Sequence, residues 1–179
     1  MTLRNARSTK GFALIDLIFV CGIIGILCSV ALPRLLLARQ AAGASSAIGS
    51  MRAINSAQLT FALTCGGGFY APKLTTLGVP PPGSNQAFLS PDVTSADTVT
   101  KSGYVIQMVA TAFPGAPGSC NGVAPGDAGQ AFMASADPTE PSNVRFFATN
   151  VNSSIWENTS TLFGVLPEVG DSPTGHVIR

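Results

Sequence analysis

An uncharged apolar run, LIFVCGIIGILCSVALP at positions 17–33, constrains the fold of this chain more than any other feature. With apolar residues at 12–15 before it and 35–37 after it, the stretch reaches the roughly 20 residues that an α-helix needs to cross a bilayer. Three basic residues precede it and two follow it: Arg4, Arg7 and Lys10, then Arg34 and Arg39. The positive-inside rule therefore predicts a cytoplasmic N-terminus and a chain that lies outside the cytoplasm after residue 40.

Asp16 is the one acidic residue in this apolar stretch. A carboxylate near the centre of a bilayer costs about 2.5–3.5 kcal/mol on insertion scales, and less near a helix end. An acid in such a position is a functional hypothesis by default, because some interaction must offset that cost.

The composition leaves room for one ordinary domain besides the apolar segment. The chain has 179 residues, of which 46% are hydrophobic and only 11% are charged, and its mean hydropathy is +0.36. The net charge of +1 provides no basic field, so nucleic-acid binding is not predicted.

A removable secretory signal peptide is the first alternative. The start MTLRNARSTKG has the character of a basic n-region, and small residues that suit cleavage lie at 28–31 and 41–44. The apolar segment, however, continues directly into a helix-compatible stretch at 35–63, which disfavours cleavage at either place.

The stretch KGFALIDLIFV at 10–20 resembles the N-terminal motif of type IV pilins and of the pseudopilins of type II secretion and competence systems. In that family a prepilin peptidase cuts after a glycine on the cytoplasmic side and methylates the new N-terminal residue. The resemblance places the cut between Gly11 and Phe12, directly after Lys10, and makes Phe12 the methylated residue. Asp16 then occupies the fifth mature position, where the family usually has the longer Glu.

The resemblance gives Asp16 a role in assembly. It lies four residues after Phe12, so the carboxylate and the new α-amino group share one helix face. In a growing filament the carboxylate could instead meet the amine of a neighbouring subunit. The alternative is that Asp16 is only a complement to the helix dipole or a residue at the membrane interface. Gly25 and Pro33 match a Gly and a Pro that the family often has, and both weaken the helix. The resemblance implies local melting there during assembly; for Pro33 the alternative is an ordinary kink in a transmembrane helix.

A single helix is predicted over 12–64. Its second half is amphipathic, with apolar residues recurring at steps near three and four and polar residues between them. The apolar set is Ala44, Ile48, Met51, Ile54 and Phe61, and the polar set is Arg52, Asn55, Ser56 and Thr60. The predicted organisation is a leader at 1–11, an assembly helix at 12–40, its amphipathic continuation at 41–64 and a globular β domain at 65–179.

After residue 65 the sequence predicts a meander of about four antiparallel strands, which with the long helix before it makes an α+β arrangement. The resemblance implies that this is the pilin fold, a long helix packed on an antiparallel sheet. The strand candidates are 101–113, 130–136, 143–149 and, more weakly, 154–163, with a short helix at 73–77. The phrases NSAQLTFAL, FYAPKLTTLG and RFFATNVNSSIW also look like one bacterial branch of pilin-like proteins, a looser likeness than the first.

The four cysteines divide into two pairs. Cys65 and Cys120 lie in the part predicted to be outside the cytoplasm, where disulfides persist, so a bridge between them is expected; two free thiols are the alternative. Cys21 and Cys28 lie on one face of the apolar helix and are interpreted as small packing residues.

Features typical of catalysis or metal binding are sparse. The single histidine, His176, has no ligand cluster beside it, and GDAG at 126–129 is interpreted as a turn. No cofactor is predicted. Asp127, Asp137, Glu140 and Asp171 could supply a structural calcium site, but no spacing specifies one, and the favoured interpretation is that they are solvated loop acids.

The resemblance implies a structural filament subunit and no enzyme. Its expected partners are copies of itself, the prepilin peptidase, the inner membrane and a pilus or secretion assembly platform in that membrane. The expected location is the bacterial inner membrane as a single-pass precursor, and then an extracellular or periplasmic filament. The alternatives are a pseudopilin, a minor or tip subunit that binds DNA or a surface, and a membrane-anchored extracytoplasmic enzyme.

Overall fold

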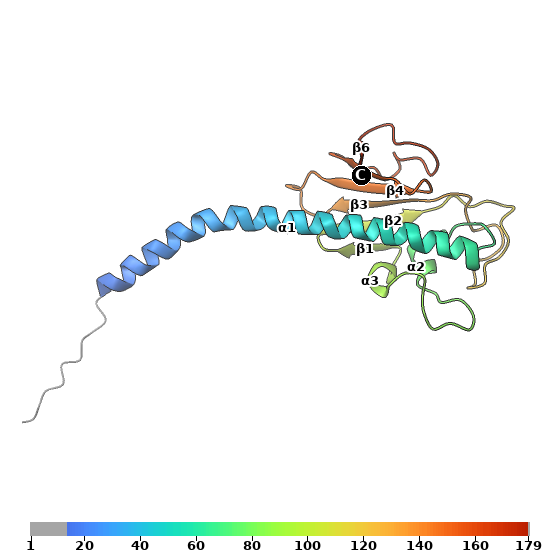
Figure 1. Ribbon diagram of the computed structural model, residues 1–179, viewed down its shortest axis with the longest axis horizontal. Coiled ribbons are helices and arrows are strands. Elements are labelled where there is room, and N and C mark those ends of the chain that lie inside the picture. Colours follow the sequence, from blue (N-terminus) through green and yellow to red (C-terminus); the bar gives the residue numbers. More distant parts are fainter. Residues whose placement is uncertain (1–13, 179) are drawn as a thin grey trace, which may run out of the picture. The chain divides into compact units, whose positions relative to one another are not determined.

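The computed structural model describes residues 14–178 and divides the chain into two compact units, Met1–Arg39 and Gln40–Arg179. Helix α1 (Leu14–Thr64) belongs to both units, and two one-turn helices follow it, α2 (Leu74–Leu77) and α3 (Pro91–Thr94). Six strands complete the second unit (Figure 1): β1 (Thr98–Lys101), β2 (Tyr104–Val109), β3 (Met133–Pro138), β4 (Phe146–Asn150), β5 (Ile155–Asn158) and β6 (His176–Ile178).

The six strands form one antiparallel sheet in the order β1-β2-β3-β4-β5-β6. The predicted α+β class, a long helix on an antiparallel sheet, is confirmed, and the short helix expected at 73–77 is α2. The predicted number of about four strands is wrong, because β1 and β6 were not anticipated. The candidate at 101–113 contains all of β2 but only Lys101, the last residue, of β1.

The turn between β1 and β2 explains that error. Ser102 and Gly103 have φ angles of 52° and 80°, and Lys101 pairs directly with Tyr104 across the hairpin. A two-residue turn with positive φ at both positions matches the twist of antiparallel strands, and glycine adopts that conformation without steric cost.

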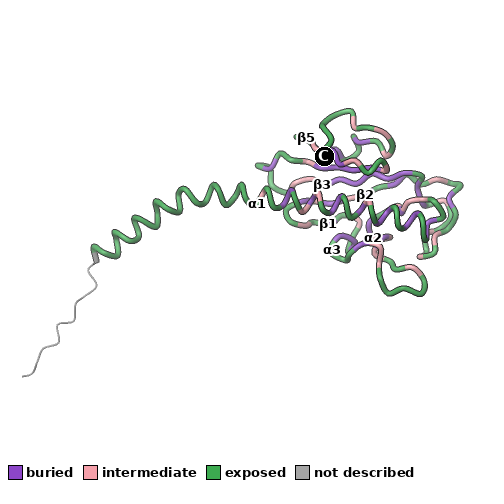
Figure 2. Tube along the Cα trace, viewed as in Figure 1, coloured by how far each residue is buried: buried purple, intermediate pink, exposed green. Residues whose placement is uncertain are grey.

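In the second unit one face of α1 packs on the sheet (Figures 1 and 2). The apolar positions expected to face the sheet are buried, except that Ile48 is half-buried; they are Ala44, Met51, Ile54 and Phe61. From the sheet they meet the side chains that point to the same face, among them Tyr104, Ile106, Ala134, Ala136 and Phe147. The apolar face of the second half of α1 thus forms one side of the main core, as its amphipathic pattern predicts.

Among the polar residues of the predicted stripe, Arg52, Ser56 and Thr60 are exposed as expected. Asn55 is half-buried instead, because its amide donates to Thr149 Oγ1 on β4 at 2.8 Å. This hydrogen bond is one of the polar contacts that hold the helix on the sheet.

The other face of the sheet holds a smaller core formed by Met133, Ala148, Trp156, Leu162 and Leu166. Leu162 and Leu166 come from the chain between β5 and β6. The Asn150 side chain anchors that segment, since its amide donates to the carbonyls of Pro167 at 2.9 Å and Gly170 at 2.7 Å. Both faces of the central strands are therefore covered.

Candidate functional site

Residues 15–37 of α1 present an apolar surface that nothing in the first unit covers (Figure 2). The most apolar 18-residue window of the helix has a mean hydropathy of 2.6, and none of that window is buried. The helix is long and apolar enough to cross a membrane. An uncovered apolar surface of this size marks a site for a membrane or for other protein chains.

Most polar groups within this segment are satisfied by the helix itself. Ser29 donates its hydroxyl to the carbonyl of Ile26 in its own helix at 2.7 Å. Helical backbone hydrogen bonds pair most peptide groups, as a hydrocarbon environment requires; the exceptions are the N–H groups of the first turn and the carbonyl of Ser29, because Pro33 has no N–H to donate to it. Up to Arg34, Asp16 is the only charged side chain that the described segment exposes.

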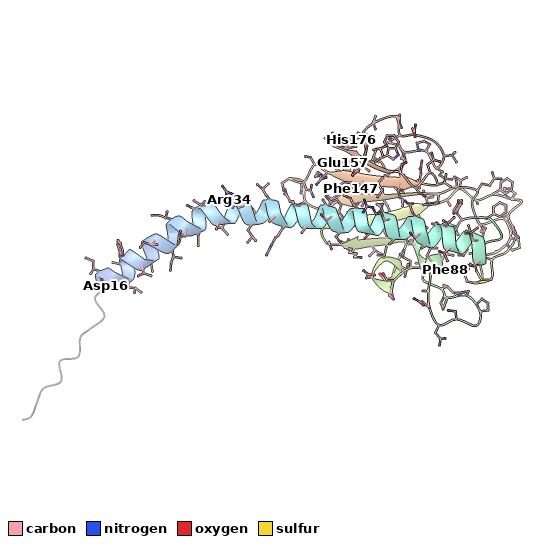
Figure 3. All side chains as sticks on the ribbon, viewed as in Figure 1. Asp16, Arg34, Phe88, Phe147, Glu157 and His176 are labelled. Atoms are coloured by element: carbon pink, nitrogen blue, oxygen red, sulfur yellow. A yellow bond between two sulfur atoms is a disulfide. The ribbon has the colours of Figure 1, made fainter. Side chains whose placement is uncertain are left out.

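Asp16 lies in the first described turn of α1 and is exposed (Figure 3). Between Ile15 and Pro33 it is the only charged residue. The predicted cleavage and methylation residues Lys10, Gly11 and Phe12 lie outside the described residues. The pairing of Asp16 with an amine at Phe12 therefore stays a prediction.

Gly25 and Pro33 both lie inside α1, and the helix is continuous through both positions. No atom lies within 4 Å of a Cβ built on Gly25. No contact within the described residues therefore requires glycine at this place. Local melting at Gly25 and Pro33 stays a prediction.

The predicted disulfide between Cys65 and Cys120 is confirmed. The two Cα atoms are 4.9 Å apart, and the backbone N–H of Cys120 donates to the carbonyl of Cys65 at 3.0 Å. The bridge joins the chain just after α1 to the loop that connects β2 and β3. Cys21 and Cys28 are free and exposed on the apolar helix.

The four acidic residues considered as calcium ligands form no cluster in the described part of the chain. Among residues 14–178 no three His, Cys, Asp or Glu side chains come together as metal ligands. Asp127, Glu140 and Asp171 are exposed, and Asp137 is half-buried with one carboxylate oxygen accepting from Thr161 Oγ1 at 2.5 Å. Burial raises the pKa of the Asp137 carboxyl, although the Thr161 hydroxyl partly opposes this effect.

An ion pair that sequence reasoning missed joins β5 to the residue before β4. Arg145 reaches both carboxylate oxygens of Glu157, at 2.5 and 3.1 Å, and its guanidinium lies 5.2 Å from the ring centre of Phe147. The hydrogen bonds from Arg145 lower the pKa of Glu157. His176 is exposed, with Nε2 3.8 Å from the same carboxylate. These contacts hold neighbouring strands together, and only the strand register, unknown from sequence, would have revealed them.

A shallow hollow of about 410 Å³ lies between residues 72–79 and 121–127. Its polar groups already serve the fold: Lys73 pairs with Asp97 at 3.1 Å, and the Asn121 amide donates to the carbonyls of Thr76 and Val79. The Thr75 hydroxyl on its wall also donates to the Asp97 carboxylate, at 2.6 Å, so these side chains bind one another and the neighbouring backbone.

Comparison with known proteins returns no match. No protein-family model, no curated protein and no solved structure matches this chain. Function must therefore be inferred from the apolar half of α1, from Asp16 and from the globular unit that the disulfide closes.

Proposed function

We propose that this chain is a structural subunit of a bacterial type IV pilus or a pilus-like filament. It would polymerise through α1 after a prepilin peptidase cuts between Gly11 and Phe12 and methylates Phe12. One observation supports the proposal above all: a single helix is apolar and uncovered over residues 15–37 and then continues as the packed wall of an α+β domain.

The uncovered half of α1 suits two successive environments. A helix that is apolar on all sides is stable in lipid, and it is equally stable in the core of a bundle of similar helices. The precursor would be held in the inner membrane as a single span. Assembly would exchange lipid for neighbouring copies of the same helix, so that little apolar surface meets water at any stage.

Asp16 would direct that exchange. In the monomer its carboxylate lies near the start of the helix, where the helix dipole favours an anion. After cleavage, the amine of Phe12 would lie on the same helix face four residues away, within the subunit or presented by its neighbour. An acid in a closely packed apolar bundle requires such a cation, because a single buried charge is costly.

The globular unit fits an extracytoplasmic location. The Cys65–Cys120 disulfide persists in an oxidising compartment. The six-stranded sheet is packed on both faces, by α1 on one and by the segment between β5 and β6 on the other. Such a unit can stack in an ordered array without unfolding, as a filament surface must.

Three substitutions at Asp16 test the proposal. Asp16→Ala should leave cleavage and membrane insertion intact but abolish filaments in the sheared surface fraction, because the docking charge is lost. Asp16→Asn should do the same with nearly unchanged shape, and Asp16→Glu should retain filaments. Normal filaments from Asp16→Ala would refute the docking role. A mature wild-type chain found only in membranes would favour a short secretion pseudopilus or a minor subunit over a pilus.

A further inference from the structure

Asp16 and Arg34 stand on one line along α1. They are 18 residues apart, which at 3.6 residues per turn is five full turns and a rise of roughly 27 Å. No other charged residue lies between them, and both are exposed (Figure 3). Arg39 lies five residues further on and is turned about 140° away from that line.

The helix face between the two charges differs from the opposite face. It carries large apolar side chains, all exposed in the first unit: Val20, Ile23, Leu27 and Val30. The opposite face mixes the small residues Cys21, Gly25 and Cys28 with the larger Ile18 and Leu32. The two charges therefore mark the ends of one bulky apolar strip, called here the Asp16–Arg34 strip.

In a bilayer this spacing allows both charges to lie outside the centre of the hydrocarbon core. The hydrocarbon core is about 30 Å thick, close to the rise between Asp16 and Arg34. Each charge can then lie near one boundary, where the long Arg34 side chain reaches the headgroups and water. A monomeric precursor thus tolerates both charges without pairing them.

A filament of equivalent copies changes the situation. Every copy turns the same face inward, so if the Asp16–Arg34 strip faces the interior, both charges leave lipid headgroups and water together. An uncompensated charge in such an apolar interior is strongly destabilising. Two parallel copies shifted by five turns bring the acid of one level with the base of the other.

We infer that Asp16 of one copy pairs with Arg34 of a neighbouring copy displaced by roughly 27 Å along the helix. This pairing rests on the proposed filament function and specifies its axial stagger. A carboxylate has two acceptor oxygens, so the same Asp16 can also receive the amine at Phe12. The occupant of the strip is a second copy of this chain, selected by complementary charge at a fixed spacing.

Substitutions at the basic end test the pairing while leaving Asp16 in place. Arg34→Leu should reduce the yield of sheared filaments by more than about tenfold, because the Asp16 carboxylate in the bundle then loses one of its two cationic partners and keeps only the amine at Phe12. Arg34→Lys should retain filaments, and Arg39→Leu, which removes the same charge from another face, should behave as the wild type. All three variants should insert into the membrane and be cleaved normally, since removing a basic residue on the outer side does not oppose insertion.

Cross-linking measures the stagger with both charges retained. In a Cys21→Ala, Cys28→Ala background, Val20→Cys combined with Ala38→Cys places two thiols 18 residues apart, close to the line of the charges. Mild oxidation of filaments should produce a ladder of disulfide-linked chains. Val20→Cys combined with Leu27→Cys lies on the same face with a seven-residue separation and should remain monomeric, as should each single variant.

The outcomes separate this inference from the function on which it rests. If wild-type chains form filaments and Arg34→Leu assembles equally well, the pairing is wrong and the filament function stands. Equal cross-linking of the two cysteine pairs would also overturn the pairing. If wild-type chains form no filament at all, the proposed function fails, and the pairing fails with it.

Discussion

Gln58 on α1 brackets the backbone of Ala71 with both ends of its side-chain amide. Its Nε2 donates to the carbonyl of Ala71 at 2.9 Å, and its Oε1 accepts from the N–H of Ala71 at 2.8 Å. Both residues are fully buried, and Gln58 Nε2 also lies 3.1 Å from the sulfur of Met108. The first stretch of chain after the disulfide is thereby held against the helix as a strand would be held in a sheet.

Gln58→Leu should destabilise the globular unit strongly. The substitution leaves the N–H and the carbonyl of Ala71 buried without partners, at a cost of about 1–3 kcal/mol for each group. Urea unfolding of the full chain in detergent, followed by tryptophan fluorescence, measures the free energy of unfolding. Gln86→Leu, at an exposed position, provides the control. Equal stability of the two variants would contradict the bracketing role.

Two glycines of α1 should respond in opposite directions to alanine. A Cβ on Gly43 would lie 2.7 Å from the carbonyl oxygen of Ser102, a backbone atom of the β1–β2 turn, whereas nothing lies within 4 Å of a Cβ on Gly49. Gly43→Ala should lower the free energy of unfolding by about 1–3 kcal/mol, because the added methyl group overpacks the contact. Gly49→Ala should raise the free energy of unfolding by about 0.5–1 kcal/mol, because glycine is a poor helix former. Thermal unfolding compares them, and a stable Gly43→Ala variant would disprove the close packing of turn and helix.

The Cys65–Cys120 bridge should contribute substantially to stability. It closes a loop with a sequence separation of 55, worth about 4 kcal/mol in a chain-entropy treatment. The double variant Cys65→Ser, Cys120→Ser should therefore unfold at a clearly lower temperature than the wild type. Reduction of the wild type should reproduce the loss. If neither change lowers the unfolding temperature, the bridge has no stabilising role.

The ionised carboxylate of Asp137 should lower the free energy of unfolding at neutral pH. Burial raises the pKa of its carboxyl in the folded chain, so ionisation is harder in the folded than in the unfolded state. The contribution of such a group is fully present below the unfolded pKa, near 3.8, and is lost as the pH rises through the folded pKa. Asp137→Asn should therefore raise the free energy of unfolding at neutral pH and change it little in acid.

The matched control for that prediction is Asp171→Asn, which makes the same change of net charge at an exposed position. Its stability difference from the wild type should be small at both pH values. An Asp137→Asn variant that is less stable than the wild type at neutral pH would contradict the prediction, and would mean that the Thr161 hydrogen bond outweighs the cost of burial.

Gly11 should be required for maturation if the proposed processing is correct. Gly11→Val should leave an uncut precursor in the membrane, because the peptidase of the resembled family cuts after glycine. Ser8→Val, in the same leader, should mature normally. Detection by antibody, with size resolved on a gel, distinguishes the two forms. A Gly11→Val chain that still begins at Phe12 would show that another enzyme makes the cut.

The long helix was predictable because its signals are local. The uncharged run at 17–33 and the steps of three and four from Ala44 to Phe61 both depend on near neighbours in sequence. The bridge of Cys65 to Cys120 followed from there being one pair of cysteines in the predicted globular part. These features needed no knowledge of the sheet.

The unpredicted elements depend on contacts between distant residues. Strand β6 has only three residues and takes its conformation from pairing with β5. Strand β1 was separable in principle, because Ser102-Gly103 is a typical two-residue turn between two β-branched runs. The bracketing of Ala71 by Gln58 and the pairing of Arg145 with Glu157 arise only once helix and strands are in register. The hydrophobic periodicity of the sequence does not predict such contacts.

The most direct measurement is the intact mass, under non-reducing conditions, of the protein sheared from the cell surface. A subunit matured as proposed should have the mass of residues 12–179 plus one methyl group and less two hydrogens. That value would report cleavage after Gly11, methylation of Phe12 and the Cys65–Cys120 disulfide together, in a fraction that contains external filaments. An uncut chain, or one that begins near residue 31 or 44, would contradict the filament account and restore a plain membrane anchor or a secreted domain.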